Sequence, residues 1–414
     1  MYRVVVTGMG VISPVGNDID TFWNNLKNGV CGIDKISRFD ASGLKVSLDA
    51  EVKEFEPKSY YDTMQEIRKS DLFMQYAMGA AKQAVEQSGI LESELDKERF
   101  GVYIGSGIGG INTTIRETKK LYEKGPEMVS PFFVPMMISN MAAGAVSIKF
   151  GAKGPTLPVV TACATSTHTI GEAFRAIRHG YADAIIAGGS EASINELAMA
   201  GFVNCQALNL SEKPEEGSLP FDKRRGGFVM GEGAGILLLE EYEHAKKRGA
   251  KILAEVAGYG NTADAYHITA PDPEGDGAIR AIKNTVKEAG ITDENEIYIN
   301  AHGTGTHLND AMETKAIKAV FGKKAYDIHV SSTKSMTGHM MGATGAVEAI
   351  ASVLALKDGI IPPTINYKEK DEECDLNYTP NKAVEAEVDF AISTSLGFGG
   401  HNACIAFKKY SEEK

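Results

Sequence analysis

Short apolar runs rich in β-branched residues recur along the chain, and glycine follows them closely. The clearest of these runs are Arg3–Thr7, Phe100–Ile104, Ala184–Ala187, Glu296–Ala301 and Phe390–Ser395. Runs of this length that end at glycine predict buried strands followed by tight turns.

Helical segments separate the predicted strands. They include Ser70–Ser88, Gly171–His179, Glu240–Arg248, Ala278–Ala289 and Ala346–Lys357. Strands that alternate with helices predict an α/β fold, in which a largely parallel sheet is covered by helices on both faces.

Two helical segments, Ala162–Ile170 and Met341–Ala351, are rich in Ala, Gly, Ser and Thr. Small side chains let other elements approach closely on every side, so we expect both helices to be deeply buried. One lies in each part of the chain, which we interpret as a weak internal duplication with similar halves over residues 1–250 and 251–414. The alternative is one irregular α/β domain.

The composition is that of a folded, water-soluble protein. Of the 414 residues, 43% are hydrophobic and 24% are charged, which excludes a disordered or collagen-like chain. With 43 Lys and Arg against 55 Asp and Glu, the formal net charge is −12. This acidic balance argues against nonspecific binding of nucleic acid or of anionic membranes.

Nothing in the sequence predicts export or membrane insertion. A single basic residue, Arg3, precedes a valine-rich strand that glycine interrupts early, which does not fit a signal peptide. No apolar run approaches the roughly 18 residues of a membrane-spanning helix. The five cysteines, at positions 31, 163, 205, 374 and 404, form no CxxC pair, and their odd number suits a reducing compartment. We therefore expect a cytoplasmic protein with no structural zinc site.

The glycine-rich segment Gly105–Gly110 formally matches a dinucleotide-binding fingerprint. No acidic residue follows a second strand about 20 residues later, and the segment from Asn112 does not open a well-packed apolar helix, so the match is weak. Neither a Walker lysine nor a His-Glu-x-x-His motif is present. We therefore expect neither a cofactor nor a catalytic metal.

Cys163 is the strongest candidate for a nucleophile. It lies after a predicted strand and at the start of a buried helix, where the helix dipole and free backbone N–H groups favour a thiolate. The other four cysteines are expected to be small buried apolar residues.

A cysteine nucleophile needs polar partners. His168 lies about 140° around the helix from Cys163, so we expect it to be a core histidine rather than the local base. His302 and His339 each stand beside glycine in a loop after a predicted strand, where side chains point into the crevice of α/β proteins.

These residues lie in motifs through which the sequence resembles the β-ketoacyl-acyl-carrier-protein synthase II family from end to end. The motifs are Thr161-Ala-Cys163-Ala, Asn300-Ala-His302-Gly-Thr-Gly-Thr306, Ser331-Ser-Thr-Lys334-Ser-Met-Thr-Gly-His339 and Gly397-Phe398-Gly-Gly-His-Asn402. The resemblance implies a thiolase-like, five-layer αβαβα fold and a homodimer. Its N-terminal half would carry the nucleophilic cysteine, and its C-terminal half the two catalytic histidines.

The resemblance also implies an acyltransferase that lengthens fatty acyl chains by a decarboxylating Claisen condensation with malonyl-carrier-protein, without a cofactor. Cys163 would carry the acyl group, and the backbone N–H groups of Cys163 and Phe398 would bind the oxyanion. His302 and His339 would stabilise the enolate. Lys334, with Glu348 as its partner, would maintain the protonation states of the site residues. Phe398 would act as a gate between the acylation step and the condensation step.

The resemblance also implies where the substrate binds. The phosphopantetheine arm would pass Thr304 and Thr306, with Thr269 and Pro271 at the entrance. The acyl tunnel would be lined by three residues, which are Ile108, Phe133 and Phe202.

Acidic carrier proteins usually dock on basic residues of this family, and Arg68 and Lys69 match that role. Glu127 and Gln206 occupy positions that are usually basic, and two further departures are Gly226, where Asp is common, and Gly305, where Ser is usual. These changes are either neutral or signs of an altered carrier.

Three alternatives stay open at this level. The chain can be a ketosynthase of a specialised or type II polyketide pathway, a noncatalytic chain-length partner or a thiolase. The presence of Cys163 with two histidines argues against a noncatalytic chain-length partner. Thiolases typically have a Cys–His pair with a second cysteine, so the two histidines favour a decarboxylating synthase over a thiolase.

Overall fold

A single ten-stranded sheet runs through the molecule in the computed structural model, which describes residues 1–411. Its strands are β1 Val4–Ile12, β4 Phe100–Gly105, β5 Thr156–Leu157, β6 Ala184–Glu191, β7 Gly233–Glu241, β8 Ala254–Ala263, β9 Ile297–Asn300, β10 His329–Ser331, β13 Phe390–Gly397 and β14 His401–Lys408. Two small pairs lie outside the sheet, namely β2 Asp34–Lys35 with β3 Leu48–Asp49, and β11 Ile360–Ile361 with β12 Val384–Glu385.

The sheet consists of two halves with the same topology. One half has the order β5-β4-β6-β7-β1 and the other has the order β10-β9-β13-β14-β8. In each half the first three strands are parallel to one another and the last two pair antiparallel. The halves meet where β1 pairs antiparallel with β8. The duplicated α/β fold is therefore confirmed, but the sheet is mixed rather than largely parallel, because one strand in each half, β7 or β14, runs opposite to both of its neighbours.

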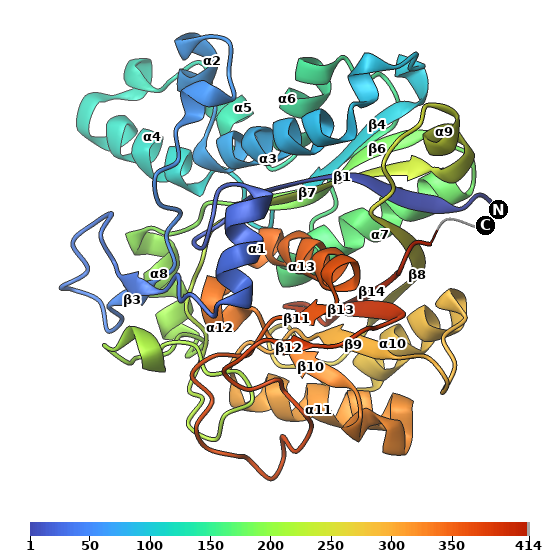
Figure 1. Cartoon of the computed structure of the whole chain (residues 1–414). Coiled ribbons are helices and arrows are strands. Elements are labelled where there is room, and N and C mark those ends of the chain that lie inside the picture. Colours follow the sequence, from blue (N-terminus) through green and yellow to red (C-terminus); the bar gives the residue numbers. More distant parts are fainter. Residues whose placement is uncertain (412–414) are drawn as a thin grey trace.

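Helices pack on both faces of each half (Figure 1). They are α1 Ile19–Lys27, α2 Met64–Arg68, α3 Leu72–Ser88, α4 Ile111–Lys124, α5 Phe133–Met137, α6 Met141–Phe150, α7 Thr165–Arg178, α8 Glu196–Asn204, α9 Tyr242–Lys247, α10 Asp276–Ala289, α11 His307–Phe321, α12 Lys334–Thr337 and α13 Thr344–Asp358. Helices α3 and α6 cover one half of the sheet, α10 and α11 cover the other, and α7 and α13 lie between the two. This is the five-layer αβαβα arrangement.

The middle layer consists of the two helices predicted from their small residues. Every residue of α13 from Thr344 to Leu356 is buried. The Ala346 N–H donates to Ser166 Oγ of α7 at 2.9 Å, and a Cβ on Gly345 would lie 1.9 Å from Thr167 Oγ1. Only small side chains allow helices to approach this closely, so the predicted burial is confirmed.

Several glycines expected to form turns lie inside strands. β1 continues through Gly8 and Gly10, and β6 continues through Gly188. A Cβ on Gly10 would lie 2.0 Å from the Ala80 carbonyl oxygen of α3. These glycines therefore admit a neighbouring element at close range instead of reversing the chain. The glycine-rich turn after β13 is correctly predicted, and Gly400 there has a φ of +72°.

Across residues 1–411, none of the helices combines the length and apolar character needed to span a bilayer. All five cysteines are free thiols. Cys374 and Cys404 are buried as predicted, whereas Cys205 is exposed at the end of α8 and Cys31 is half-buried. The prediction of burial is therefore wrong for Cys205.

Candidate active site

Cys163 lies in a tight 3-10 turn, Ala162–Ala164, that leads into α7. Ala162 has a φ of +52°, a left-handed conformation that is strained for a residue with a side chain. The turn is fixed by close backbone contacts, since a Cβ on Gly397 would lie 2.7 Å from the Thr161 carbonyl oxygen and 3.3 Å from the Cys163 nitrogen. Glycine at 397 is therefore what brings the loop after β13 against the nucleophile.

A pocket that opens onto the cysteine contains most of the predicted site residues. The predicted residues that line it are Cys163, Phe202, Thr269, Pro271, His302, Thr304, Thr306, His339 and Phe398. They come from both halves of the chain, so the site exists only when the halves pack together. Aromatic rings form part of the wall, with Phe202 6.4 Å from Phe398 and 5.7 Å from Phe228, between ring centroids.

The thiol of Cys163 is protonated at rest. Burial raises its pKa to about 12, although the positive charge of Lys334 and the backbone N–H groups of Phe398 and Cys163 act in the opposite direction. Burial therefore opposes the thiolate that the position of Cys163 at a helix N-terminus was expected to favour. The same two N–H groups are the predicted oxyanion donors, and both interact with the sulfur.

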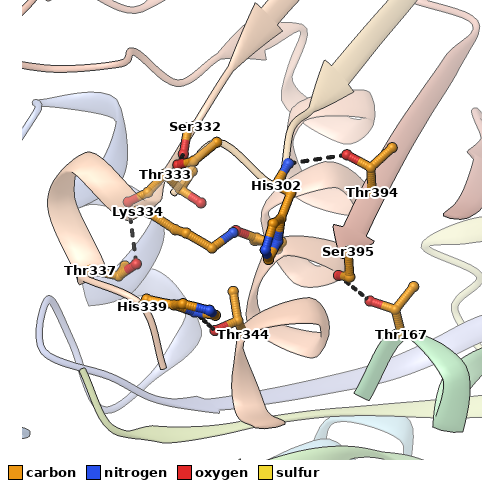
Figure 2. Close-up of polar contacts among 12 residues, drawn as sticks. Thr167, His302, Ser332, Thr333, Lys334, Thr337, His339, Thr344, Thr394 and Ser395 are labelled. Atoms are coloured by element: carbon orange, nitrogen blue, oxygen red, sulfur yellow. Dashed lines mark hydrogen bonds and ion pairs between the residues drawn. The ribbon is translucent and has the colours of Figure 1, made fainter. Parts of the chain in front are cut away.

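His302 and His339 face each other across the pocket (Figure 2), with ring centroids 5.4 Å apart and planes at 86°. His302 follows β9, and its backbone N–H donates to Glu313 Oε1 at 2.7 Å and to Thr394 Oγ1 at 3.0 Å. His339 follows α12, and its Nδ1 lies 3.1 Å from Thr344 Oγ1. A hydroxyl proton donated by Thr344 to Nδ1 leaves Nε2 of His339 as the N–H donor.

Both imidazoles are neutral. Burial, reinforced by the charge of Lys334, lowers the pKa of each histidine well below its ordinary value. Lys334 itself is buried, and its Nζ lies 2.5 Å from Glu348 Oε1 of α13. Burial raises the pKa of Glu348 to about 7, against the opposing effect of Lys334. The ion pair thus places a positive charge close to two histidines and keeps them as uncharged hydrogen-bond donors.

The glycine-rich loop after β4 binds a carboxylate of the chain itself. Glu191, fully buried at the end of β6, accepts hydrogen bonds from Ser106 Oγ and from the backbone N–H groups of Gly107 and Ile108. It also accepts one from the Gly342 N–H at 3.1 Å. The N–H groups that a nucleotide phosphate would need are therefore occupied, which explains why the fingerprint is misleading.

Sequence reasoning missed Glu191 and Glu313. Glu313 lies on the buried side of α11 and accepts hydrogen bonds from the N–H groups of His302 and Gly303 and from the Thr394 hydroxyl. The available signal was a pair of acidic residues, Asp310 and Glu313, three positions apart on a helix, which indicates a polar buried stripe.

Some predicted site residues lie away from the pocket. Ile108 is 39% exposed and Phe133 is half-buried on α5, and neither lines the pocket in the single chain. Arg68 and Lys69 lie at the exposed end of α2.

His168 is buried and hydrogen-bonds with Thr161 Oγ1 and Asn261 Oδ1. It is therefore a core histidine, as predicted.

Known proteins resemble this chain over nearly its whole length. The family models for the beta-ketoacyl synthase N-terminal and C-terminal domains match residues 1–245 and 253–368. The 3-oxoacyl-[acyl-carrier-protein] synthase 2 of Staphylococcus aureus (strain COL) is 52% identical over 408 residues, which are 99% of this chain and 98% of that protein.

Two solved structures have the same fold. The ishigamide ketosynthase/chain length factor matches with a TM-score of 0.92 and 36% identity, over 99% of this chain and 100% of that one. A ketosynthase solved in complex with its type II PKS acyl-carrier protein matches with a TM-score of 0.90 and 35% identity, over the same shares.

Proposed function

The chain belongs to the β-ketoacyl synthase family, and we propose that it is a β-ketoacyl-acyl-carrier-protein synthase II. It lengthens fatty acyl chains by two carbons through a decarboxylating Claisen condensation. The observation that carries this function is the pocket in which one cysteine, two neutral histidines and two backbone donors converge.

The first half-reaction transfers the acyl group to the enzyme. Cys163 Sγ attacks the thioester carbonyl carbon of the acyl-carrier-protein, the carbon–sulfur bond to the arm breaks, and the thiol proton ends on the departing arm. The N–H groups of Cys163 and Phe398 stabilise the oxyanion of the tetrahedral intermediate. Because the raised pKa of Cys163 keeps the thiol neutral before the substrate binds, the thiol must lose its proton as the sulfur attacks the thioester.

The second half-reaction forms the carbon–carbon bond. The malonyl group loses CO₂, and the electron pair of the broken bond becomes an enolate on the thioester oxygen. His302 and His339 donate N–H hydrogen bonds to this oxygen. The enolate carbon then attacks the acyl thioester on Cys163, and the released thiolate takes a proton from water. Two neutral hydrogen-bond donors suit decarboxylation, because loss of CO₂ forms the enolate without removal of a proton. A thiolase-type reaction starts from an acetyl group instead and would need a base to remove a proton from it.

The substrate arm enters along the threonines at the pocket mouth. Thr304 Oγ1 and Thr306 Oγ1 lie 3.1 Å apart, and Thr269 is exposed at the entrance beside Pro271. Hydroxyls in this position hydrogen-bond the amides of the phosphopantetheine arm. Gly305 between them has a φ of +77°, which glycine adopts without the strain that a serine there would experience.

Fatty-acid elongation is favoured over a specialised pathway by the degree of similarity. The chain is 52% identical to a 3-oxoacyl-[acyl-carrier-protein] synthase 2, compared with 36% and 35% for the ketosynthases of the two solved structures. A direct test supplies acyl- and malonyl-carrier-protein and follows the carrier-bound product by mass spectrometry. A β-ketoacyl chain two carbons longer is expected, and an unchanged acyl thioester would refute the function.

The active form is a homodimer built at the edge strand β5. This strand ends the ten-stranded sheet, and Leu157 on it is 50% exposed. Val160 is 48% exposed beyond it, and Ile148 on the adjacent helix α6 is 81% exposed. An open apolar sheet edge of this kind is normally covered by another chain.

Light scattering should therefore give twice the mass of the chain, and Leu157→Lys should shift the protein towards monomer. An unchanged dimer after this substitution would place the interface elsewhere.

A further inference from the structure

Each half of the chain contains a sharp turn at the start of its middle-layer helix. In the first half, Ala162–Ala164 contains Cys163 and leads into α7, and in the second half Met341–Ala343 leads into α13. Both turns begin with a non-glycine residue in the left-handed region, with a φ of +52° in the first turn and +46° in the second. The matching geometry makes Gly342 the counterpart of Cys163 in the second half.

The turn of the second half binds a carboxylate of the chain itself. In the first half, the N–H groups of Cys163 and Phe398 are the proposed donors to the oxyanion of the substrate. In the second half, the N–H groups of Gly342 and Gly107 both donate to Glu191 Oε2, at 3.1 and 2.9 Å. A pair of backbone donors at the second turn is therefore already occupied by an anion.

The other oxygen of Glu191 is bound as well. Oε1 accepts hydrogen bonds from the Ser193 hydroxyl at 2.9 Å, the Ser106 hydroxyl at 3.2 Å and the Ile108 N–H at 3.3 Å. Burial raises the pKa of Glu191, and these hydrogen bonds act in the opposite direction. Three of the five donors are backbone N–H groups, which can only donate and so favour the ionised carboxylate.

Glu191 lies where three segments around the nucleophile meet. A Cβ on Gly107 would lie 2.7 Å from Glu191 Oε2 and 3.5 Å from the Ala162 carbonyl oxygen, and a Cβ on Gly342 would lie 2.4 Å from the Gly107 nitrogen. The loop after β4 and both turns are thus in close contact through glycines. A shift of the carboxylate would therefore move the turn that contains Cys163.

The charge of Glu191 also acts on the nucleophile. Burial raises the pKa of the Cys163 thiol to about 12, Lys334 lowers it, and Glu191 raises it. Lys334 is paired with Glu348, with Nζ 2.5 Å from Oε1, whereas the five donors to Glu191 are all uncharged groups. The negative charge near the sulfur is therefore not cancelled by an ion pair at Glu191.

We propose that Glu191 is a positioning residue for the reaction, a resident anion that holds the loop after β4 and both turns in the arrangement that Cys163 needs for its attack. The inference rests on the proposed function, since it concerns the first half-reaction. Because Glu191 occupies the second turn permanently, only the turn of the first half is open to a substrate carbonyl. The same charge disfavours a free thiolate before the substrate arrives.

Glu191→Gln in the full-length protein tests the charge. Gln has nearly the volume of Glu, but its NH₂ group must face at least one backbone N–H group. Acylation of Cys163, measured in a single turnover with acyl-carrier-protein, should slow about 10²-fold, because the reacting atoms are displaced. Alkylation of Cys163 by iodoacetamide at pH 8 should become about 3- to 10-fold faster, because loss of the negative charge favours the thiolate. Mass spectrometry of the peptide that contains Cys163 separates this thiol from the other four.

Glu191→Asp tests the position separately. Aspartate keeps the anion but is shorter by one methylene group, so acylation should slow about 10-fold or more while alkylation stays near the wild-type rate. Near-UV circular dichroism reports whether each variant is folded. If Glu191→Gln does not fold, the Asp variant alone decides, since acylation at the wild-type rate would overturn the proposal.

Glu191→Ala leaves room for a small carboxylate. Added formate should restore part of the acylation and slow the alkylation again, whereas formamide, a neutral molecule of similar size, should do neither. The matched control is Glu240→Gln, which changes another buried carboxylate. Glu240 on β7 pairs with Ala184 at the start of β6, seven residues or about 23 Å from Glu191, so neither rate should change.

Three results would overturn the role of Glu191. They are an unchanged alkylation rate in the folded Gln variant, wild-type acylation in the Asp variant, and equal rescue of the Ala variant by formate and formamide. Failure of the proposed function is distinguishable, since the wild-type protein would then not elongate its substrate, whereas alkylation needs no substrate and still compares the variants.

Discussion

Replacing Cys163 with alanine is expected to abolish both formation of the acyl-enzyme and chain elongation. The sulfur is the atom that carries the acyl group, and the pocket holds no other cysteine among the residues that line it. Loss of a covalent nucleophile commonly lowers turnover by at least about 10⁴-fold. Mass spectrometry of the intact protein after incubation with acyl-carrier-protein measures the acyl adduct directly, and product analysis measures elongation.

The natural control for this experiment is Cys205→Ala. Cys205 is a free thiol that is more exposed than Cys163, and it lies just beyond α8 outside the residues that line the pocket. If exposure alone decided which cysteine is acylated, Cys205 would carry the acyl group, and Cys205→Ala would lower both acylation and elongation. The control should instead acylate and elongate like the wild type. Elongation that survives in Cys163→Ala would show that another group carries the acyl chain.

Replacing His339 with alanine is expected to separate the two half-reactions. Removing one N–H donor to the enolate should slow decarboxylation by about 10²- to 10³-fold, the typical effect of losing a single oxyanion donor. Acylation of Cys163 should proceed, because its oxyanion is bound by the backbone of Cys163 and Phe398. Single-turnover measurement of the acyl-enzyme, together with release of CO₂ from malonyl-carrier-protein, distinguishes the steps.

Two further variants define the role of His339. His339→Gln keeps an N–H donor and should recover part of the decarboxylation, whereas a purely structural role predicts no rescue. His179→Ala, at the exposed end of α7, removes an imidazole away from the pocket and should have no effect. Loss of acylation in His339→Ala with decarboxylation intact would contradict the assigned role.

Local patterns were enough to predict much of the fold. The small residues of α7 and α13 predicted the buried middle layer and the duplication, because side-chain volume limits how closely helices approach. Strand directions were not predictable in this way. The first residues of Glu240–Arg248 belong to the end of β7, so the helix α9 is shorter than expected. Whether a strand runs parallel depends on how distant segments pair, which no local pattern contains.

The sequence also predicted some features of the site and not others. Cys163, His302 and His339 were recognisable because each lies in a short motif at the end of an element. The protonated thiol was not, since the pKa of Cys163 depends on burial by the loop around Gly397, more than 200 residues away along the chain. Ile108 lies outside the pocket of a single chain, and its position as an acyl-tunnel residue stays a prediction that depends on the dimer.

The most direct test of the account is the ratio of CO₂ released to β-ketoacyl product formed. The wild-type protein is incubated with acyl-carrier-protein and labelled malonyl-carrier-protein, and both products are measured in the same reaction. The mechanism predicts one CO₂ for each chain lengthened by two carbons. Elongation without release of CO₂ would indicate thiolase chemistry, and CO₂ release without elongation would leave Cys163 without its role; either result would contradict the assignment as a decarboxylating condensing enzyme.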